Sequence, residues 1–249
     1  MRYCASGKIR KTESGPPKFF LMDKKLRIAI LLPGHLRTWR YCRTNFLENV
    51  YDPQHSVDVF VDTYYNDFRT DMYAKHERHF AKHLAAPEII ELFTGINVIS
   101  CHIEQENNAD AGDEQKRKIL QILRNLEEQK SEYDLVVRSR FDILVQEKVD
   151  YSSIYRETEE EPNLIHLGKG SVNGINDMFA VCRSKVFSIY GNRFNLVNTV
   201  DPHRSLFQIE RKYGVKYKHS IPTATVRIGA DGKYRIEKSD MLPEVLEKF

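Results

Sequence analysis

The sequence predicts a single α/β domain whose central sheet is mostly parallel and flanked by helices. Segments 27–32, 38–49 and 57–63 follow one another as strand, helix and strand, and this succession is typical of two parallel strands joined by a crossover. Apolar runs and helical stretches continue to residue 228, without an internal repeat or a strong linker after residue 25. We therefore expect one domain rather than two.

The first elements can be justified one by one. The run 27–32 is apolar after Arg27 and closes with Pro33-Gly34, so it reads as a buried strand that runs into a tight turn. A helix is expected over 38–49. The next strand, 57–63, alternates between apolar and polar residues and ends in polar ones, which places functional groups at its carboxyl end.

The later elements follow from the same patterns. Apolar residues recur at helical spacing between 113 and 130, with charged residues on the other face, and predict an amphipathic helix. The segment 133–145 begins as a β-branched strand and switches abruptly to Arg and Asp. The other expected elements are a polar helical stretch around 70–83, a strand at 96–100, an acidic loop at 157–161, a strand at 164–167, a Gly/Asn-rich connection at 168–176, a helix at 202–213 and strands at 215–219 and 223–228.

Composition and charge exclude several classes of protein. The 249 residues are 41% hydrophobic and 29% charged, which is ordinary for a globular domain. The net charge of +3 is concentrated in residues 1–25, which hold seven basic residues against two acidic ones. We expect 1–25 to be a disordered basic tail and 26–249 to be the folded domain. This split argues against a basic face for nucleic acid.

Targeting signals and cysteine spacing point to the cytoplasm. No stretch approaches the roughly 20 apolar residues that a transmembrane helix needs, and the N-terminus lacks the apolar core of a secretory signal. The four cysteines are widely spaced and include no CxxC pair, so neither a zinc knuckle nor a disulfide framework is indicated. We expect buried thiols in a reducing compartment.

Three polar clusters fall at the expected carboxyl ends of strands, where open α/β sheets bind ligands. They lie at 33–38, 62–64 and 138–142. If the sheet is parallel, all three face one crevice. A histidine cluster at His76, His79 and His83 has helical spacing, but it lacks the glutamate of a zinc-protease motif, and its charged neighbours favour a solvated face.

The first cluster joins a glycine turn to the start of a helix. Free backbone N–H groups in the turn at Pro33, Gly34 and His35 could bind an anion. Arg37 would add positive charge to this anion-binding site. A plain turn with a Thr38 cap is the equally weighted alternative.

The third cluster places Arg138, Arg140 and Asp142 after an apolar strand, where they would be costly to bury unless paired or bound to a ligand. A structural Arg140–Asp142 ion pair is one interpretation. In the functional one, Asp142 holds a divalent cation, Mn²⁺ or Mg²⁺, together with phosphate oxygens, and Arg138 or Arg140 neutralises a leaving diphosphate.

The order of segments 27–38, 58–63, 133–142 and 176–181 resembles GT-A-like glycosyltransferases of bacteria and large DNA viruses, over about residues 26–230. The resemblance implies a GT-A-like, Rossmann-type sandwich and a hexosyl- or pentosyltransferase. Its donor would be a nucleotide-diphosphate sugar, a UDP-sugar in the first place. Its acceptor would be an oligosaccharide or glycoprotein glycan.

The resemblance also implies roles for residues. Asp62, Thr63 and Tyr64 would bind the donor near its nucleoside, whereas Arg37 and Arg138 would lie near its phosphates. The sequence departs from the family where many members have Asp-x-Asp, because it reads Arg140-Phe141-Asp142. Two alternatives remain open: a cation bound through Asp142 and the diphosphate, or Arg140 in place of the cation.

Asp177 is the candidate catalytic base on the acceptor side, as an inverting transfer requires a carboxylate beside the acceptor hydroxyl. A role as a helix or turn cap is the alternative. Further candidates in the same region are Asp201, His203 and Glu210.

Two other functions share these features. A sulfo- or phosphoryl-transferase would use the same glycine turn for its anion, although the sequence has no Walker-type lysine. A non-catalytic carbohydrate-binding module would hold a glycan without turnover.

Overall fold

The computed structural model describes residues 24–67, 81–106, 111–169, 176–199, 201–228 and 231–237. Nearly all of the expected basic tail, most of the expected helical stretch at 70–83, and His76 and His79 lie outside these residues.

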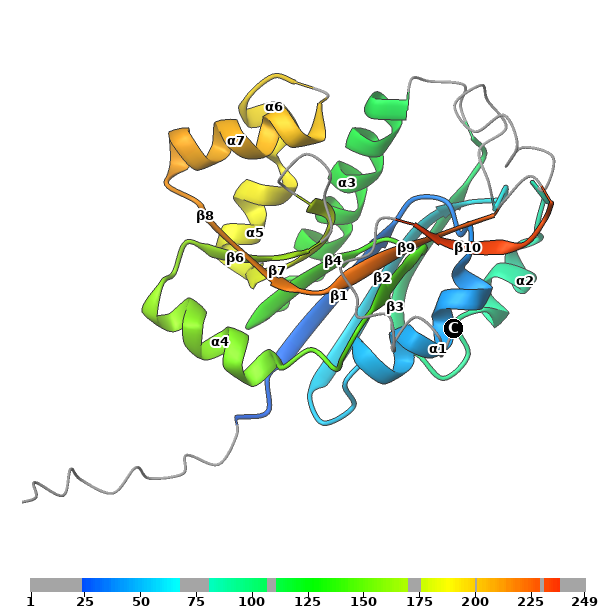
Figure 1. Cartoon of the computed structure of the whole chain (residues 1–249), viewed down its shortest axis with the longest axis horizontal. Coiled ribbons are helices and arrows are strands. Elements are labelled where there is room, and N and C mark those ends of the chain that lie inside the picture. The colour runs from blue at the N-terminus through cyan, green and yellow to red at the C-terminus, as the bar shows by residue number, and fades with distance from the viewer. Residues whose placement is uncertain are drawn as a thin grey trace, which may run out of the picture.

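A seven-stranded sheet with the order β3-β2-β1-β4-β7-β6-β8 forms the centre of the molecule (Figure 1). Strands β3, β2, β1 and β4 are parallel neighbours, and β6 is parallel to β8, whereas β7 is antiparallel to both β4 and β6. The mostly parallel sheet confirms the predicted fold class. The strands are β1 (Arg27–Pro33), β2 (Ser56–Tyr64), β3 (Val98–Glu104), β4 (Leu135–Ser139), β6 (Leu164–Gly168), β7 (Asn176–Arg183) and β8 (Lys216–Ile221).

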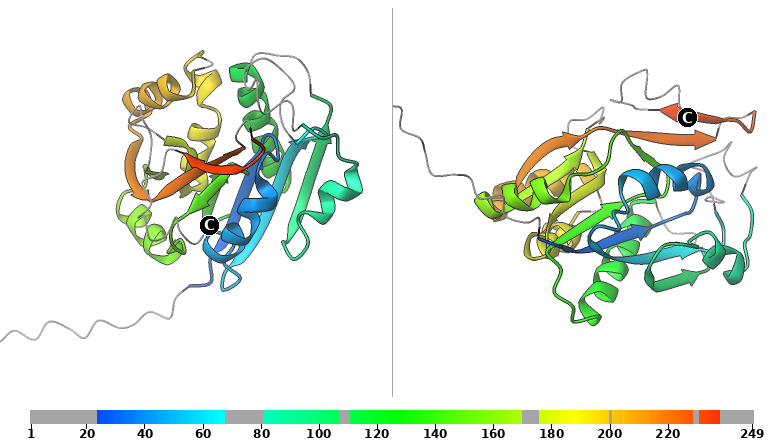
Figure 2. Two further views of the ribbon diagram at one scale, coloured as in Figure 1. Left: turned by 45° about the vertical axis from the view of Figure 1, so that its right-hand side comes forward. Right: turned by 90° about the horizontal axis from the view of Figure 1, so that it is seen from below.

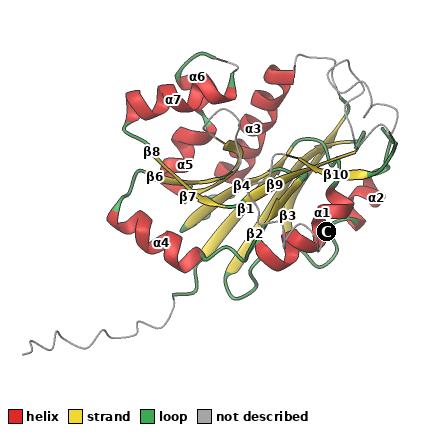
Figure 3. Ribbon diagram, in the orientation of Figure 1, coloured by secondary structure: helices red, strands yellow, loops and turns green. Residues whose placement is uncertain are grey.

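Helices cover both faces of the sheet (Figure 3). Side chains of α1, α2 and α4 join the core on one face, and side chains of α3, α5 and α7 join the core on the other. No helix in the described part of the chain is both long and apolar enough to cross a membrane. The helices are α1 (Trp39–Asn49), α2 (Ala86–Glu91), α3 (Ala111–Glu128), α4 (Tyr151–Glu160), α5 (Ser184–Gly191), α6 (Arg193–Leu196) and α7 (Pro202–Tyr213).

The two cores follow directly from strand geometry. Successive side chains of a strand point to opposite faces, so Ile28 and Ile30 pack with α1 while Ala29 and Leu31 pack with α3. All positions of β1 after Arg27 are buried, as expected for a central parallel strand. Both faces of β1 are therefore buried in the core, which explains why its sequence is a continuous apolar run.

A second, three-stranded antiparallel sheet lies beside α1 (Figure 2). It contains β5 (Ile143–Val145), β9 (Thr223–Ile228) and β10 (Tyr234–Glu237). Val226 donates its backbone N–H to the Asp142 carbonyl at 2.8 Å, and Thr38 donates its hydroxyl to the Val226 carbonyl at 3.2 Å. The second sheet thus ties the C-terminal region to the segments that follow β1 and β4.

Three local expectations are wrong. The acidic segment 157–161 is largely helical, because α4 extends to Glu160 and buries Tyr151, Ile154 and Thr158. Thr38 makes no side-chain cap to α1, since its hydroxyl bonds β9 instead. Cys101 is exposed on the edge strand β3, although Cys42 and Cys182 are buried as expected.

Candidate functional site

The predicted site residues lie along one edge of the main sheet, where β1, β2 and β4 end. Pro33 pairs with Asp62, and Leu31 pairs with Arg138, so the polar residues that follow these strands are neighbours. Because β7 is antiparallel to β4, its first residues reach the same edge, and Asp177 stands two residues before the Ser139 partner Phe179. The topology therefore gathers segments from four strands.

The loop after β1 crosses this edge. Gly34 has a φ of 115°, a conformation that favours glycine, and its N–H bonds the Asp62 carbonyl at 2.9 Å. Arg37 also has a positive φ, 46°, which costs about 1–2 kcal/mol in a residue with a Cβ. Its N–H bonds the Asp67 carbonyl at 2.7 Å. Surrounding contacts hold this strained backbone in place.

Three guanidinium groups surround the Asp142 carboxylate, and we call Arg37, Arg140 and Arg227 the arginine cluster. Arg140 binds both carboxylate oxygens, at 2.8 and 2.5 Å. Arg37 lies 3.4 Å and Arg227 3.5 Å from Asp142 Oδ2. Burial alone would raise the pKa of Asp142, but the charges of the three arginines outweigh it and hold the pKa well below its usual range.

Three guanidinium groups converge on one buried carboxylate at this edge. Guanidinium groups gathered in this way are suited to an anion. The structural Arg140–Asp142 ion pair considered from the sequence is present, whereas a metal-binding role for Asp142 stays a prediction. Sequence reasoning missed Arg227, whose only signal is a basic residue within the apolar run of β9.

Asp177 lies on the α3 side of the sheet in a second buried network. Its Oδ2 accepts a hydrogen bond from Gln115 at 2.9 Å, and guanidinium nitrogens of Arg193 and Arg138 lie 3.5 and 3.7 Å away. Burial would raise the pKa of Asp177, but Arg138 and Arg193 outweigh it and lower the pKa. Tyr190 accepts a hydrogen bond from Arg138 at 3.3 Å.

The catalytic role considered for Asp177 stays a prediction. Asp177 lies within β7 rather than at a helix start, so it does not cap a helix. Its carboxylate is ionised at neutral pH and is held at the edge of the sheet. Gln115 and Arg193 were not predicted, because each is one polar residue among many on a helix.

Asp62 is held on the α3 side by a buried lysine. Lys118 Nζ lies 2.5 Å from Asp62 Oδ1 and 2.5 Å from Glu104 Oε1, and it donates to the Thr63 carbonyl at 2.9 Å. His102 Nδ1 lies 3.0 Å from the same Asp62 oxygen. Asp62 Oδ2 is buried without a hydrogen-bond partner among the described residues.

Tyr64 connects this group to the loop after β1. Its ring stacks on His35 at a centroid distance of 4.3 Å, and Lys118 Nζ lies 4.0 Å from its centroid. Arg117 donates to the Tyr64 hydroxyl at 3.1 Å. Two residues further along, the loop carries Arg37 to the arginine cluster on the side of α1. The expectation of one shared crevice needs correction, because the groups share an edge but occupy both sides of the sheet.

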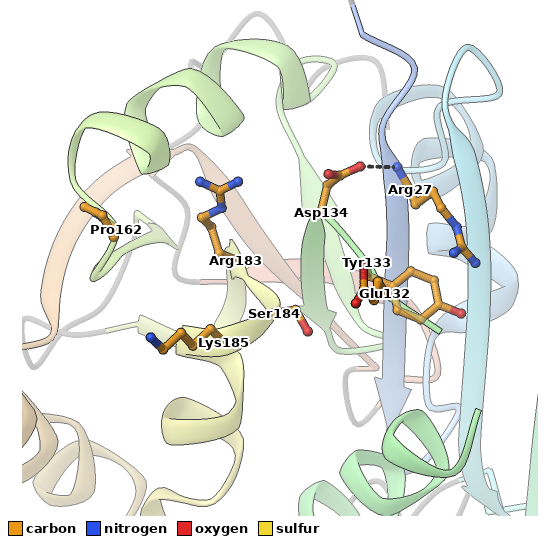
Figure 4. Close-up of a pocket in the computed structure, with 8 residues that line it drawn as sticks. All are labelled: Arg27, Glu132, Tyr133, Asp134, Pro162, Arg183, Ser184 and Lys185. Atoms are coloured by element: carbon orange, nitrogen blue, oxygen red, sulfur yellow. Dashed lines mark hydrogen bonds between the residues drawn. The ribbon is translucent and has the colours of Figure 1, made fainter. Parts of the chain in front are cut away.

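A separate hollow of about 550 Å³ opens at the opposite edge of the sheet, near the start of β1 (Figure 4). It collects charges of both signs, and Asp134 is already bound by the Arg27 N–H at 2.9 Å and by Lys24 at 2.6 Å. The candidate site therefore remains the carboxyl edge. The hollow is lined by Arg27, Glu132, Tyr133, Asp134, Pro162, Arg183, Ser184 and Lys185.

Comparison with known proteins gives likenesses of fold. No protein-family model matches the sequence, and no curated protein is significantly similar to it. The glycosyltransferase GlyE of Streptococcus pneumoniae TIGR4 is 12% identical, with a TM-score of 0.40, over 78% of this chain and 45% of that one. This chain therefore spans less than half of the length of GlyE.

A second solved structure is a glycosyltransferase involved in the glycosylation of the major capsid of PBCV-1. It is 15% identical, with a TM-score of 0.36, over 77% of this chain and 79% of that one.

Proposed function

We propose that this chain is a glycosyltransferase that moves a sugar from a nucleotide-diphosphate donor, a UDP-sugar, to a hydroxyl of an oligosaccharide or glycoprotein glycan. The arginine cluster carries this proposal, because it gathers three guanidinium groups at the carboxyl edge beside a glycine turn. The sequence resemblance of 27–38 and 133–142 to GT-A-like enzymes supports the same function.

The arginine cluster would stabilise the leaving nucleotide diphosphate. Negative charge builds on the diphosphate as its bond to the sugar breaks, and preorganised guanidinium groups stabilise such charge strongly in a site that excludes water. Asp142 holds the three arginines together before the donor arrives. On this proposal the arginines supply the positive charge that stabilises the diphosphate. In the alternative, Mn²⁺ or Mg²⁺ bound through Asp142 and the diphosphate would supply it.

Asp177 would accept the proton of the acceptor hydroxyl in an inverting transfer. Its lowered pKa keeps it ionised at neutral pH, which is the form that a general base needs when the hydroxyl attacks the anomeric carbon. Gln115 and the two arginines fix the direction of the carboxylate. The donor would lie across the edge, between Asp177 and the arginine cluster.

Substitution of Arg227 tests the role of the cluster. The protein is incubated with a panel of nucleotide sugars, and the released nucleoside diphosphate is measured. Arg227→Met should lower kcat/KM for the accepted donor about 100-fold, as loss of one preorganised donor group does in other enzymes. Arg235→Met is the matched control, since Arg235 pairs with Arg227 across β9 and β10 but binds Asp231 instead.

The same assay can also contradict the proposed activity. Wild-type protein that neither binds nor hydrolyses any donor would reject the proposed activity, and binding of a glycan without turnover would identify a carbohydrate-binding module. Activity that survives EDTA supports the arginines as the stabilising charge. Activity that is lost with EDTA and restored by Mn²⁺ shows that the reaction needs a cation.

A further inference from the structure

We propose that His35, Glu106 and Glu114 bind one divalent transition-metal ion on the α3 side of the carboxyl edge. The three residues come from the loop after β1, the segment after β3 and the first turns of α3. One ligand atom of each lies within 4.8 Å of the other two, and His35 Nε2 stands 3.9 Å from Glu106 Oε1. This metal site is separate from Asp142, which binds arginines on the other side.

The hydrogen bond of the His35 ring fixes which nitrogen faces the carboxylates. Nδ1 lies 3.1 Å from the Asn66 carbonyl oxygen. Because a carbonyl oxygen only accepts hydrogen bonds, Nδ1 carries the hydrogen, and the lone pair of the neutral ring is on Nε2. Nε2 faces the Glu106 carboxylate oxygen 3.9 Å away, and a metal ion shared by the two atoms would bridge them. Metal-binding histidines commonly show this pattern, with the second nitrogen bonded to a carbonyl.

Burial and packing hold the ligands in place. His35 is 7% and Glu114 3% exposed, and the Glu106 side chain is 4% exposed. The Tyr64 ring stacks on His35, and Arg117 lies 3.4 Å from Glu114 Oε1. The site therefore has a fixed imidazole and two carboxylates in an environment that excludes most water.

The donor set selects the class of ion. One imidazole nitrogen with two carboxylate oxygens suits Zn²⁺, Co²⁺, Mn²⁺ or Fe²⁺, whereas Mg²⁺ and Ca²⁺ prefer oxygen ligands alone. A bound ion would join the loop after β1 to α3. Because Arg37 is two residues after His35, the ion would also steady the backbone that positions the arginine cluster.

Titration of the metal-free full chain with CoCl2 tests the site. Wild-type protein stripped with EDTA should bind one Co²⁺, followed by calorimetry and by the visible absorption of the ion. Glu114→Gln and His35→Ala should each weaken binding about tenfold or more, because even indirect ligand contacts are worth that much. The distant Glu157→Gln should leave Co²⁺ affinity unchanged.

Wild-type protein that binds no Co²⁺, or Glu114→Gln that binds it as tightly as wild type, would overturn the proposal. If the variants do not fold, pulsed EPR of Mn²⁺ bound to the wild type decides. Coupling to an imidazole nitrogen that persists in His102→Ala supports the site, because His102 with Asp62 and Glu104 is another group of described residues that could hold a metal ion. Absence of coupling in the wild type, or its loss in His102→Ala, rejects the site. No donor is present in these measurements, so failure of the proposed transfer activity leaves their outcome intact.

Discussion

Arg37 combines an unfavourable backbone conformation with a charge in the proposed donor site. Its φ of 46° is the region that favours glycine, and its guanidinium group lies 3.4 Å from Asp142. Arg37→Gly should relieve the backbone strain while Arg37→Met retains it, so the glycine variant should be more stable by about 1 kcal/mol. Urea unfolding measures the difference, and both variants should lose donor hydrolysis. Equal stability would show that the backbone is not strained at this position.

Lys118 is the central cation of the Asp62 group. It is 1% exposed and contacts both Asp62 and Glu104 at 2.5 Å. Lys118→Met should destabilise the protein by about 3 kcal/mol or more, because it leaves two carboxylates without their shared partner. Lys116→Met, two residues earlier on α3, serves as the control for losing a lysine from this helix. Similar unfolding free energies for the two variants would contradict the prediction.

The residues that sequence reasoning found and missed differ in their surroundings. Arg138 was recognisable because it interrupts an apolar strand, and Asp142 because it follows that strand closely. Lys118 and Arg193 are as deeply buried, but they lie on helices where lysine and arginine are common on exposed faces. Only the tertiary contacts distinguish them from solvated residues.

Strands β6 and β8 and helix α4 meet around the buried His166. Its Nδ1 lies 2.9 Å from Ser220 Oγ, and its Nε2 stands 3.6 Å from Glu157. Burial lowers the pKa of His166 below its ordinary value of 6.5. The unfolded chain therefore binds more protons below that pH, and stability should fall as the pH drops below about 6.5.

Urea unfolding between pH 7.5 and 5.5 checks this dependence. His166→Asn should lose less stability over the interval than wild type, because the variant has no imidazole to protonate there. An equal loss in the two proteins would assign the pH dependence to other groups.

Secondary structure was predictable where one pattern dominates. Strand β1 is buried on both sides and reads as an unbroken apolar run, and α7 has Asp201 as a cap at its start and Gly214 at its end. Helix α4 was mistaken in part for a loop, because its exposed glutamates conceal the buried positions Tyr151 and Ile154. For α4, the spacing of the buried residues was a better guide to the helix than the acidic composition of its C-terminal part.

At the scale of the whole molecule, the candidate site draws on segments far apart in the sequence. The loop at 34–37, the end of β4 and strand β9 meet at Asp142. Binding of UDP should therefore slow amide hydrogen exchange in all three segments and leave β8 unaffected. Mass spectrometry of peptic fragments measures this exchange. Protection at the opposite edge, near 132–134 and 183–185, would place the ligand elsewhere.

The place of Asp177 depends on topology that local sequence patterns do not contain. The sequence indicated a strand after this residue, but only the antiparallel pairing of β7 with β4 brings its first residues to the carboxyl edge. The second sheet was equally inaccessible, since β5 spans three residues and finds its partner β9 about 80 positions later. Long-range strand pairing, rather than local propensity, determines both the place of Asp177 and the formation of the second sheet.

The bond between Val226 and Asp142 has a consequence for synthesis on the ribosome. All seven strands of the main sheet are translated before β9, so much of the core can assemble on a nascent chain. Arg227 and its strand are translated after all of these strands. A nascent polypeptide arrested before residue 223 would thus carry an incomplete set of guanidinium groups, and its capacity to bind a diphosphate would arise only once translation has passed that point.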